Sequence, residues 1–107
     1  MLHVYGIPNC NTVKKVLDQL KSEGQHITFH DFKKEGISKA KLEAWSKAVG
    51  WEALVNKKGT TWRGLLPEVQ ASITNKTNAF ALMQDKPSII KRPVIEWPEG
   101  RVTVGFY

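Results

Sequence analysis

The chain has 107 residues, the size of one ordinary domain, which leaves no room for a substrate domain beside a cofactor domain. Its 41% hydrophobic and 24% charged residues are typical of a soluble globular protein and exclude a disordered tail. A formal net charge of +6 favours an anionic substrate or an acidic partner. We therefore expect a single domain over residues 1–107.

The sequence carries no targeting signal that we can identify. Residues 1–8 lack a basic leader and a long apolar run, and no stretch approaches the roughly eighteen apolar residues of a membrane span. The single cysteine, Cys10, cannot form an internal disulfide, which suits a reducing compartment. These observations predict a cytoplasmic protein without membrane association.

Hydrophobic periodicity predicts a βαβ unit at the start of the chain. Apolar residues alternate with other residues over 2–5 and 27–30, which indicates two short strands. Between them an amphipathic helix is expected to begin near Cys10 and to end near Gly24. Its apolar stripe is Val13, Val16, Leu17 and Leu20. Such units cross over right-handedly and place their strands parallel.

The middle of the chain is predicted to be helical. One helix is expected from the N-cap Ser38 to Gly50, with a short helical turn over 51–55 after it. Two glycines and a proline interrupt any period over 59–67, so we expect a loop there. A last helix over 74–86, with Ala79, Leu82 and Met83 facing inward, ends before Pro87.

Two strands are predicted near the C-terminus, around Val94–Ile95 and 102–104, joined by a tight turn at Pro98, Glu99 and Gly100. The resulting order is a βαβ half, a helical insertion and an antiparallel β-hairpin. This order predicts the α/β class and a thioredoxin-like fold with an enlarged middle.

Cys10 is the strongest candidate for a catalytic residue. The start of a helix carries about half a positive charge and unpaired N–H groups, which favour a thiolate. The N–H groups of Asn11, Thr12 and Val13, the Thr12 hydroxyl and the Lys14 ammonium could all contact the sulfur or a bound anion. The alternative is that Cys10 is a small buried hydrophobic residue.

Val13 occupies the position of the second thiol of a Cys-x-x-Cys pair. Any oxidation cycle at Cys10 must then use an external thiol. Glutathione is the natural candidate in the cytoplasm, because its carboxylates suit a basic site and thiolate attack proceeds through a mixed disulfide.

Arg92 and Pro93 form a second candidate constellation. An arginine just before a strand can place a permanent cation beside a thiolate or an oxyanion. The alternative is a surface arginine and a proline that starts an edge strand.

Other residues are better explained by packing or solvation. His26 and His30 lie about 13 Å apart on one strand, too far to share an ion, so we predict no metal site. The tryptophans are expected to pack in or near the core, although Trp62 could line a substrate groove. Nucleic-acid binding is not expected, because no aromatic residues are interleaved with the lysines.

Three segments together resemble the arsenate reductase (ArsC), Spx and YffB group, and most closely its YffB-like branch. They are residues 5–15 around Cys10, residues 87–95 around Arg92, and residues 56–63. The resemblance implies a thioredoxin-like fold with a helical insertion, Cys10 as nucleophile, Arg92 as its cationic partner and Pro93 in the cis form.

The sequence also departs from that group. Asn56 and Gly105 stand where its arsenate reductases carry further arginines, so these two positions count against arsenate reduction without deciding it. Asn11 replaces a common Asp, and Val13 removes the Cys-x-x-Cys switch of Spx-type regulators. The group usually continues into a C-terminal helix, whereas this sequence ends at Tyr107, so we expect one face of its sheet to be less covered.

The leading hypothesis is a glutathione-dependent thiol reductase with a single-cysteine mechanism. Its catalytic residues are Cys10 and Arg92, and glutathione is its co-substrate, without a metal. The other substrate is an oxidised small molecule or protein thiol. The residues expected to bind substrate or glutathione are Asn11, Thr12, Val13, Lys14, Trp62 and Pro93. The alternative is a non-catalytic, Spx-like regulatory protein that binds RNA polymerase or another protein partner.

Overall fold

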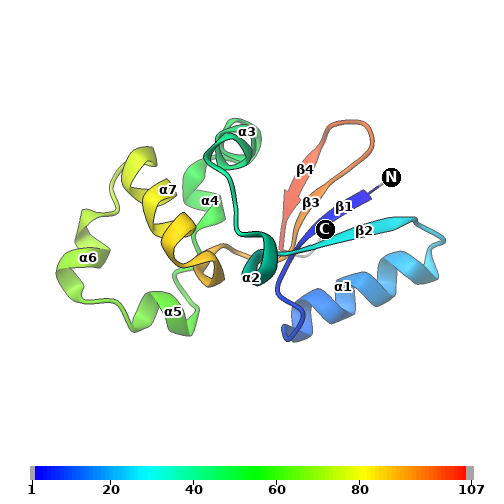
Figure 1. The fold of residues 1–107 in the computed structure, drawn as a ribbon, viewed down its shortest axis with the longest axis horizontal. Helices are drawn as coiled ribbons and strands as arrows, with labels where there is room; N and C mark the ends of the chain where they lie inside the picture. Colours follow the sequence, from blue (N-terminus) through cyan, green and yellow to red (C-terminus); the bar gives the residue numbers. More distant parts are fainter. Residues whose placement is uncertain (1, 106–107) are drawn as a thin grey trace. The chain divides into compact units, whose positions relative to one another are not determined.

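The computed structural model describes residues 2–105, which form two compact units (Figure 1). The first unit contains residues 2–35 and 92–105, and the second contains residues 36–91. The elements are β1 (Leu2–Gly6), α1 (Asn11–Ser22), β2 (Ile27–Asp31), α2 (Phe32–Glu35), α3 (Lys39–Val49), α4 (Trp51–Leu54), α5 (Thr60–Arg63), α6 (Pro67–Ser72), α7 (Lys76–Asp85), the 3-10 turn η1 (Pro87–Ile89), β3 (Val94–Glu96) and β4 (Val102–Val104). The expectation of one domain over the whole chain stays a prediction.

The first unit is built on a four-stranded sheet with the order β2-β1-β3-β4. β2 is parallel to β1, as the predicted βαβ unit requires, whereas β3 is antiparallel to both β1 and β4. The sheet and hairpin confirm the α/β class and the predicted arrangement of a βαβ half followed by a ββ half. The positive φ of Gly100, 100°, suits the turn between β3 and β4.

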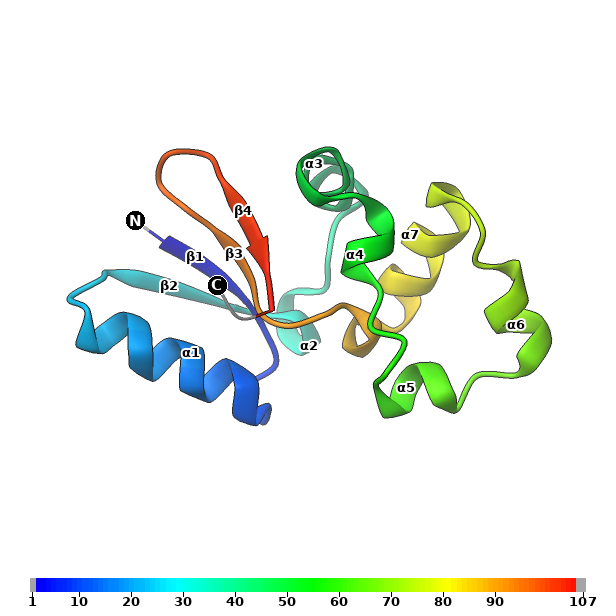
Figure 2. The same cartoon turned by 180° about the vertical axis from the view of Figure 1, so that it is seen from behind.

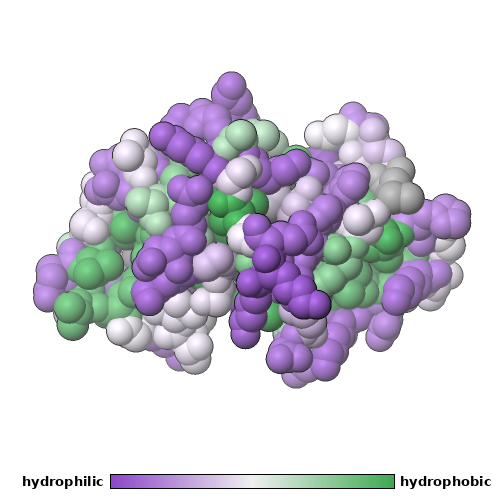
Figure 3. Space-filling view, in the orientation of Figure 1, coloured by the Kyte–Doolittle hydropathy of each residue, from purple (hydrophilic) through white to green (hydrophobic). Residues whose placement is uncertain are grey.

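Helix α1 covers one face of this sheet, as Figure 2 also shows. Val16 and Leu20 of α1 pack with Leu2, Val4 and Ile95 of the strands in one buried cluster. These residues confirm the predicted helical and two-residue periods. Leu17, Ile27, Phe29 and Trp97 pack against the cluster but stay partly exposed, and Figure 3 shows hydrophobic surface over α1 and β2.

The opposite face of the sheet carries a row of polar side chains. Register places His3, Tyr5, His30 and Glu96 on this face, because residues of one strand alternate between the two faces. The Tyr5 hydroxyl donates a hydrogen bond to Glu96 at 3.0 Å, and the Tyr5 ring stacks on His30 with ring centroids 4.3 Å apart.

The second unit consists of α3 to α7 and η1. Ser38 caps α3 by accepting a hydrogen bond from the Lys41 N–H at 3.1 Å, and Gly50 ends the helix at a φ of 86°, both as predicted. The buried side chains of the second unit are Leu42, Trp45, Leu54, Val55, Ile73, Ala79, Phe80, Leu82, Met83, Ile89 and Ile90. Ala79, Leu82 and Met83 therefore face inward, as the sequence indicates.

The predicted loop over 59–67 is wrong in part, because Gly59 and residues 64–66 lie outside helices but the other residues of the segment are helical. Residues Thr60–Arg63 form the helical turn α5, in which the Arg63 N–H donates to the Gly59 carbonyl at 3.2 Å. Pro67 starts the helix α6 and does not interrupt a helical period, because its fixed φ and missing N–H are tolerated at the first position of a helix. The last helix is capped by Asn75, so α7 begins two residues later than expected.

Within residues 2–105, no helix is both long enough and apolar enough to cross a lipid bilayer. The expectation that one face of the sheet is less covered concerns the end of the chain, at Phe106 and Tyr107, which lies outside the described residues.

Candidate active site

The thiol of Cys10 lies at the junction between β1 and α1, where the sequence placed it. The Cys10 N–H donates to the Ile7 carbonyl at 3.3 Å, and the Cys10 carbonyl accepts from the Lys14 N–H at 3.0 Å as the first bond of α1. Cys10 is therefore the N-cap residue, with an extended backbone at φ −101° and ψ 122°. Its side chain is only partly buried, so the thiol is accessible to a reactant.

Opposing effects act on the ionisation of Cys10. Partial burial raises the pKa of the thiol. The backbone N–H of Val13, the guanidinium of Arg92 and the backbone N–H of Thr12 lower the pKa, and together they outweigh burial. The pKa of Cys10 consequently lies below the ordinary thiol value, which is the direction that its place at a helix start predicts.

Arg92 reaches Cys10 from the segment that leads into β3. Val94, the first residue of β3, pairs with Tyr5 near the end of β1, so the preceding residues lie beside the loop that carries Cys10. The peptide bond between Arg92 and Pro93 is cis, as the family resemblance implied. The Pro93 carbonyl accepts a hydrogen bond from the Gly105 N–H at 2.9 Å, which fixes this segment to the end of β4.

Close packing fixes the first turn of α1 against β1. Val13 is fully buried, and a Cβ atom placed on Gly6 would lie 2.9 Å from Val13 Cγ2. Only glycine leaves room for Val13 at this point, because real Cβ atoms essentially never approach so closely. Gly6 thus helps to fix the first turn of α1, whose Val13 N–H lowers the pKa of Cys10.

Comparison with known proteins identifies the family of the chain. The model of the ArsC family matches residues 5–107. The chain belongs to the ArsC family. An uncharacterised protein of Haemophilus influenzae is 40% identical over 106 residues, which cover 99% of this chain and 91% of the relative.

Two solved structures extend the comparison from sequence to fold. The structure of a YFFB protein superposes with a TM-score of 0.92 at 38% identity, over 100% of this chain and 92% of the other. An arsenate reductase (ArsC) related protein from Brucella melitensis has a TM-score of 0.80 at 42% identity, over 99% and 87% of the two chains. The thioredoxin-like fold of this ArsC-family protein is thereby confirmed, and so is the resemblance to the YffB-like branch.

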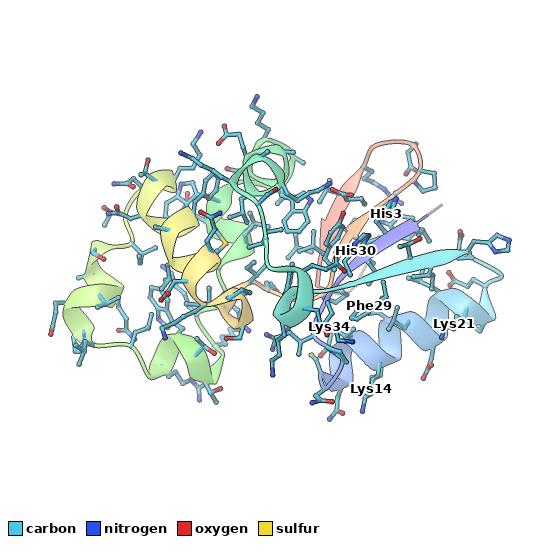
Figure 4. The ribbon with its side chains drawn as sticks, viewed as in Figure 1. His3, Lys14, Lys21, Phe29, His30 and Lys34 are labelled. Atoms are coloured by element: carbon cyan, nitrogen blue, oxygen red, sulfur yellow. The ribbon has the colours of Figure 1, made fainter. Side chains whose placement is uncertain are left out.

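The remaining predicted site residues near Cys10 lie on the first turn of α1. Asn11 and Lys14 are exposed, and Figure 4 shows Lys14 on this helix. Thr12 is half-buried, and it is its backbone N–H that acts on the thiol. Val13 presents its N–H to the sulfur while its side chain is buried, so only its backbone is available to a ligand.

Trp62 belongs to the second unit, on α5. The Lys57 ammonium lies 5.4 Å from the centroid of the Trp62 ring, and the Gln70 side chain donates to the Trp62 carbonyl at 2.8 Å. The Asn56 side chain, also in the second unit, accepts a hydrogen bond from the Lys58 N–H at 3.1 Å. A role for Trp62 in binding glutathione stays a prediction.

Sequence reasoning missed one pair of histidines. His3 Nδ1 lies 2.9 Å from His30 Nε2, because β1 and β2 are neighbours in the sheet. From the sequence, His30 was compared only with His26, which the structure places just before β2 and not on it. The predicted parallel pairing of the two strands was the signal that could have found the pair. Among residues 2–105, no group of three or more His, Cys, Asp or Glu side chains is arranged to hold a metal ion.

Proposed function

We propose that this ArsC-family protein is a glutathione-dependent thiol oxidoreductase that works through one cysteine. The observation that carries the proposal is the accessible Cys10 thiol, whose pKa is lowered by helix N–H groups and by Arg92. Val13 in the place of a resolving cysteine supports a mechanism that uses an external thiol. Family membership supports thiol redox chemistry.

In the first step of the proposed reaction, the Cys10 thiolate attacks the glutathione sulfur of a mixed disulfide. A new bond forms between Cys10 and glutathione, the old S–S bond breaks, and the substrate leaves as a thiolate that takes a proton from solvent. In the second step, the thiolate of a second glutathione attacks the glutathione sulfur bound to Cys10. Oxidised glutathione leaves and the Cys10 thiolate is regenerated, so each mixed disulfide that is reduced consumes one free glutathione thiol and releases one molecule of oxidised glutathione.

The residues around the thiol have distinct roles in this proposal. The guanidinium of Arg92 stabilises the anionic sulfur before attack and after release. The exposed Asn11 and Lys14, with the N–H groups of Thr12 and Val13, bind a glutathione carboxylate at the start of α1. Pro93 presents backbone beside the thiol. A reducing compartment, the cytoplasm, supplies the glutathione.

Turnover of a mixed disulfide between glutathione and a small thiol tests the proposal. The wild type should oxidise glutathione, Cys10→Ser should be inactive, and Arg92→Ala should be slower by about 10²-fold or more. Equal rates for the wild type and Cys10→Ser would refute the mechanism. The rival hypothesis, a regulatory protein that binds RNA polymerase or another partner, would instead be favoured by stoichiometric capture of that partner by Cys10→Ser.

A matched pair of lysines tests the glutathione site separately. Lys14 and Lys21 are both exposed on α1, but only Lys14 lies in the turn next to Cys10 (Figure 4). Lys14→Ala should raise the KM for glutathione a few-fold, because the carboxylate loses a nearby cation. Lys21→Ala should leave this KM unchanged. An equal effect of the two substitutions would indicate general attraction by net charge and not a binding site.

A further inference from the structure

The polar face of the first unit's sheet carries two imidazoles whose ring nitrogens point at each other. His3 on β1 and His30 on β2 approach through Nδ1 and Nε2, 2.9 Å apart, with ring centroids 5.1 Å apart. Figure 4 shows both side chains on the neighbouring strands. The register of the two strands pairs His30 with Tyr5 and so brings it within reach of His3. The fold alone therefore converges two nitrogen donors on one point.

We propose that His3 Nδ1 and His30 Nε2 form a binding site for a borderline divalent transition-metal ion, of which Zn²⁺ is the test case. Neutral imidazole nitrogens are preferred ligands for this class of ion. Two nitrogens bound to one tetrahedral zinc ion at about 2.0–2.1 Å are separated by roughly 3.3 Å. When the ion binds, the proton of this hydrogen bond moves through solvent from His3 Nδ1 to His3 Nε2, and the separation of 2.9 Å widens by about 0.4 Å.

The surroundings of His30 resemble those of metal-bound histidines. Its second nitrogen, Nδ1, lies 3.0 Å from the Glu35 carboxylate, which favours the tautomer whose Nε2 is unprotonated and presents its lone pair to His3. The Tyr5 ring stacks on the imidazole with an angle of 11° between the planes, which restricts its rotation. Glu35 and Tyr5 are therefore positioning residues that hold the ligand nitrogen in place.

The number of protein ligands determines how tightly the site binds the ion. Only two protein ligands are present, so water completes the coordination, and the partial exposure of the His30 side chain, 22%, leaves room for it. A site with half the ligands of a structural zinc site should bind with a Kd on the order of 10 µM. Such a site exchanges its metal readily.

Zinc titration followed by isothermal calorimetry tests the proposal. All measurements use the Cys10→Ser background without a polyhistidine tag, because the thiol would otherwise compete for zinc. One zinc ion per chain should bind to the parent protein. His3→Ala and His30→Ala should each weaken binding at least tenfold, and Glu35→Gln about tenfold. His26→Ala is the matched control, since His26 is an exposed histidine just before β2, and it should leave the affinity unchanged.

Long-range ¹H–¹⁵N spectra of the imidazoles identify the ligand atoms. Zinc should shift the resonances of His3 Nδ1 and His30 Nε2, and leave those of His26 unchanged. His3→Gln and His30→Gln are further variants with smaller changes of shape, for use if an alanine variant unfolds. No binding of zinc below 1 mM to the folded protein, or binding that survives His30→Gln, would overturn the proposal and leave an ordinary hydrogen-bonded pair.

Discussion

The close contact between Gly6 and Val13 makes Gly6→Ala a sensitive test of how the active-site turn is built. The new Cβ would lie 2.9 Å from Val13 Cγ2. Val13 is fully buried and β-branched, so its methyl group has neither an open direction nor an alternative rotamer in a helix. Relief of the contact must therefore move the first turn of α1 away from β1.

The magnitude follows from two opposing effects. Overpacking a buried site costs about 1–3 kcal/mol. Alanine also lowers the conformational entropy of the unfolded chain, which stabilises the folded protein by about 0.4–1 kcal/mol. This gain applies because the φ of Gly6 is not in the left-handed region. The free energy of unfolding should fall by about 0.5–2 kcal/mol, which corresponds to a decrease in Tm of roughly 2–8 °C for a chain of this size.

Urea denaturation and thiol titration together provide the assay. Gly6→Ala should lower the free energy of unfolding and also raise the pKa of Cys10, since the Val13 N–H moves from the sulfur. Gly59→Ala is a suitable control: its Cβ would meet the Asn56 amide at 3.0 Å, and that half-buried side chain can turn aside. If Gly6→Ala is as stable as Gly59→Ala and keeps the low thiol pKa, the reasoning about this contact is wrong.

Three further predictions concern the thiol itself. Arg92→Ala should raise the pKa of Cys10, with Arg92→Lys intermediate, as followed by the ultraviolet absorbance of the thiolate; identical titrations would exclude the guanidinium as a cause. Because the pKa of Cys10 is lowered in the folded state, its ionisation should stabilise the protein above the unfolded thiol pKa and lose this effect as pH falls through the folded value; urea denaturation against Cys10→Ser at several pH values checks this sign. Val13→Cys, which restores a Cys-x-x-Cys pair at the start of α1, should form an intramolecular disulfide with Cys10 in oxidised glutathione, where the wild type keeps a glutathione adduct; mass spectrometry distinguishes the two, and a lasting adduct on Val13→Cys would contradict this prediction.

Most of the first unit could be predicted because its signals are local. The apolar spacing of Val13, Val16 and Leu20 defined α1 and its buried face, and alternation around Val4 defined a strand. The position of Cys10 followed from where that helix had to begin. The pairing of Cys10 with Arg92, which lies 82 positions later in the chain, was implied by the family resemblance and not by the pattern of residues.

The errors came from segments whose structure depends on contacts beyond their own sequence. α5 has only four residues, too few for a hydrophobic period, and its Thr61 hydroxyl lies 2.9 Å from that of Ser88 in η1. α2, which the sequence pattern did not predict, also has only four residues. A proline disrupts the interior of a helix but is favoured at its first position, and the sequence alone did not show which case applies to Pro67. The His3 and His30 pair was missed because it depends on strand register.

The activation of Cys10 and the stability of α1 are two aspects of one interaction. An ordinary N-cap side chain accepts a hydrogen bond from the first turn of its helix, and here the position is held by a thiol. Ionisation turns this weak acceptor into an anion that faces the N–H groups of Thr12 and Val13. The first turn contains no acidic residue that would compete with the thiolate for these groups, since Asn11 is neutral. The same free energy that favours the thiolate must therefore also stabilise the helix that carries it.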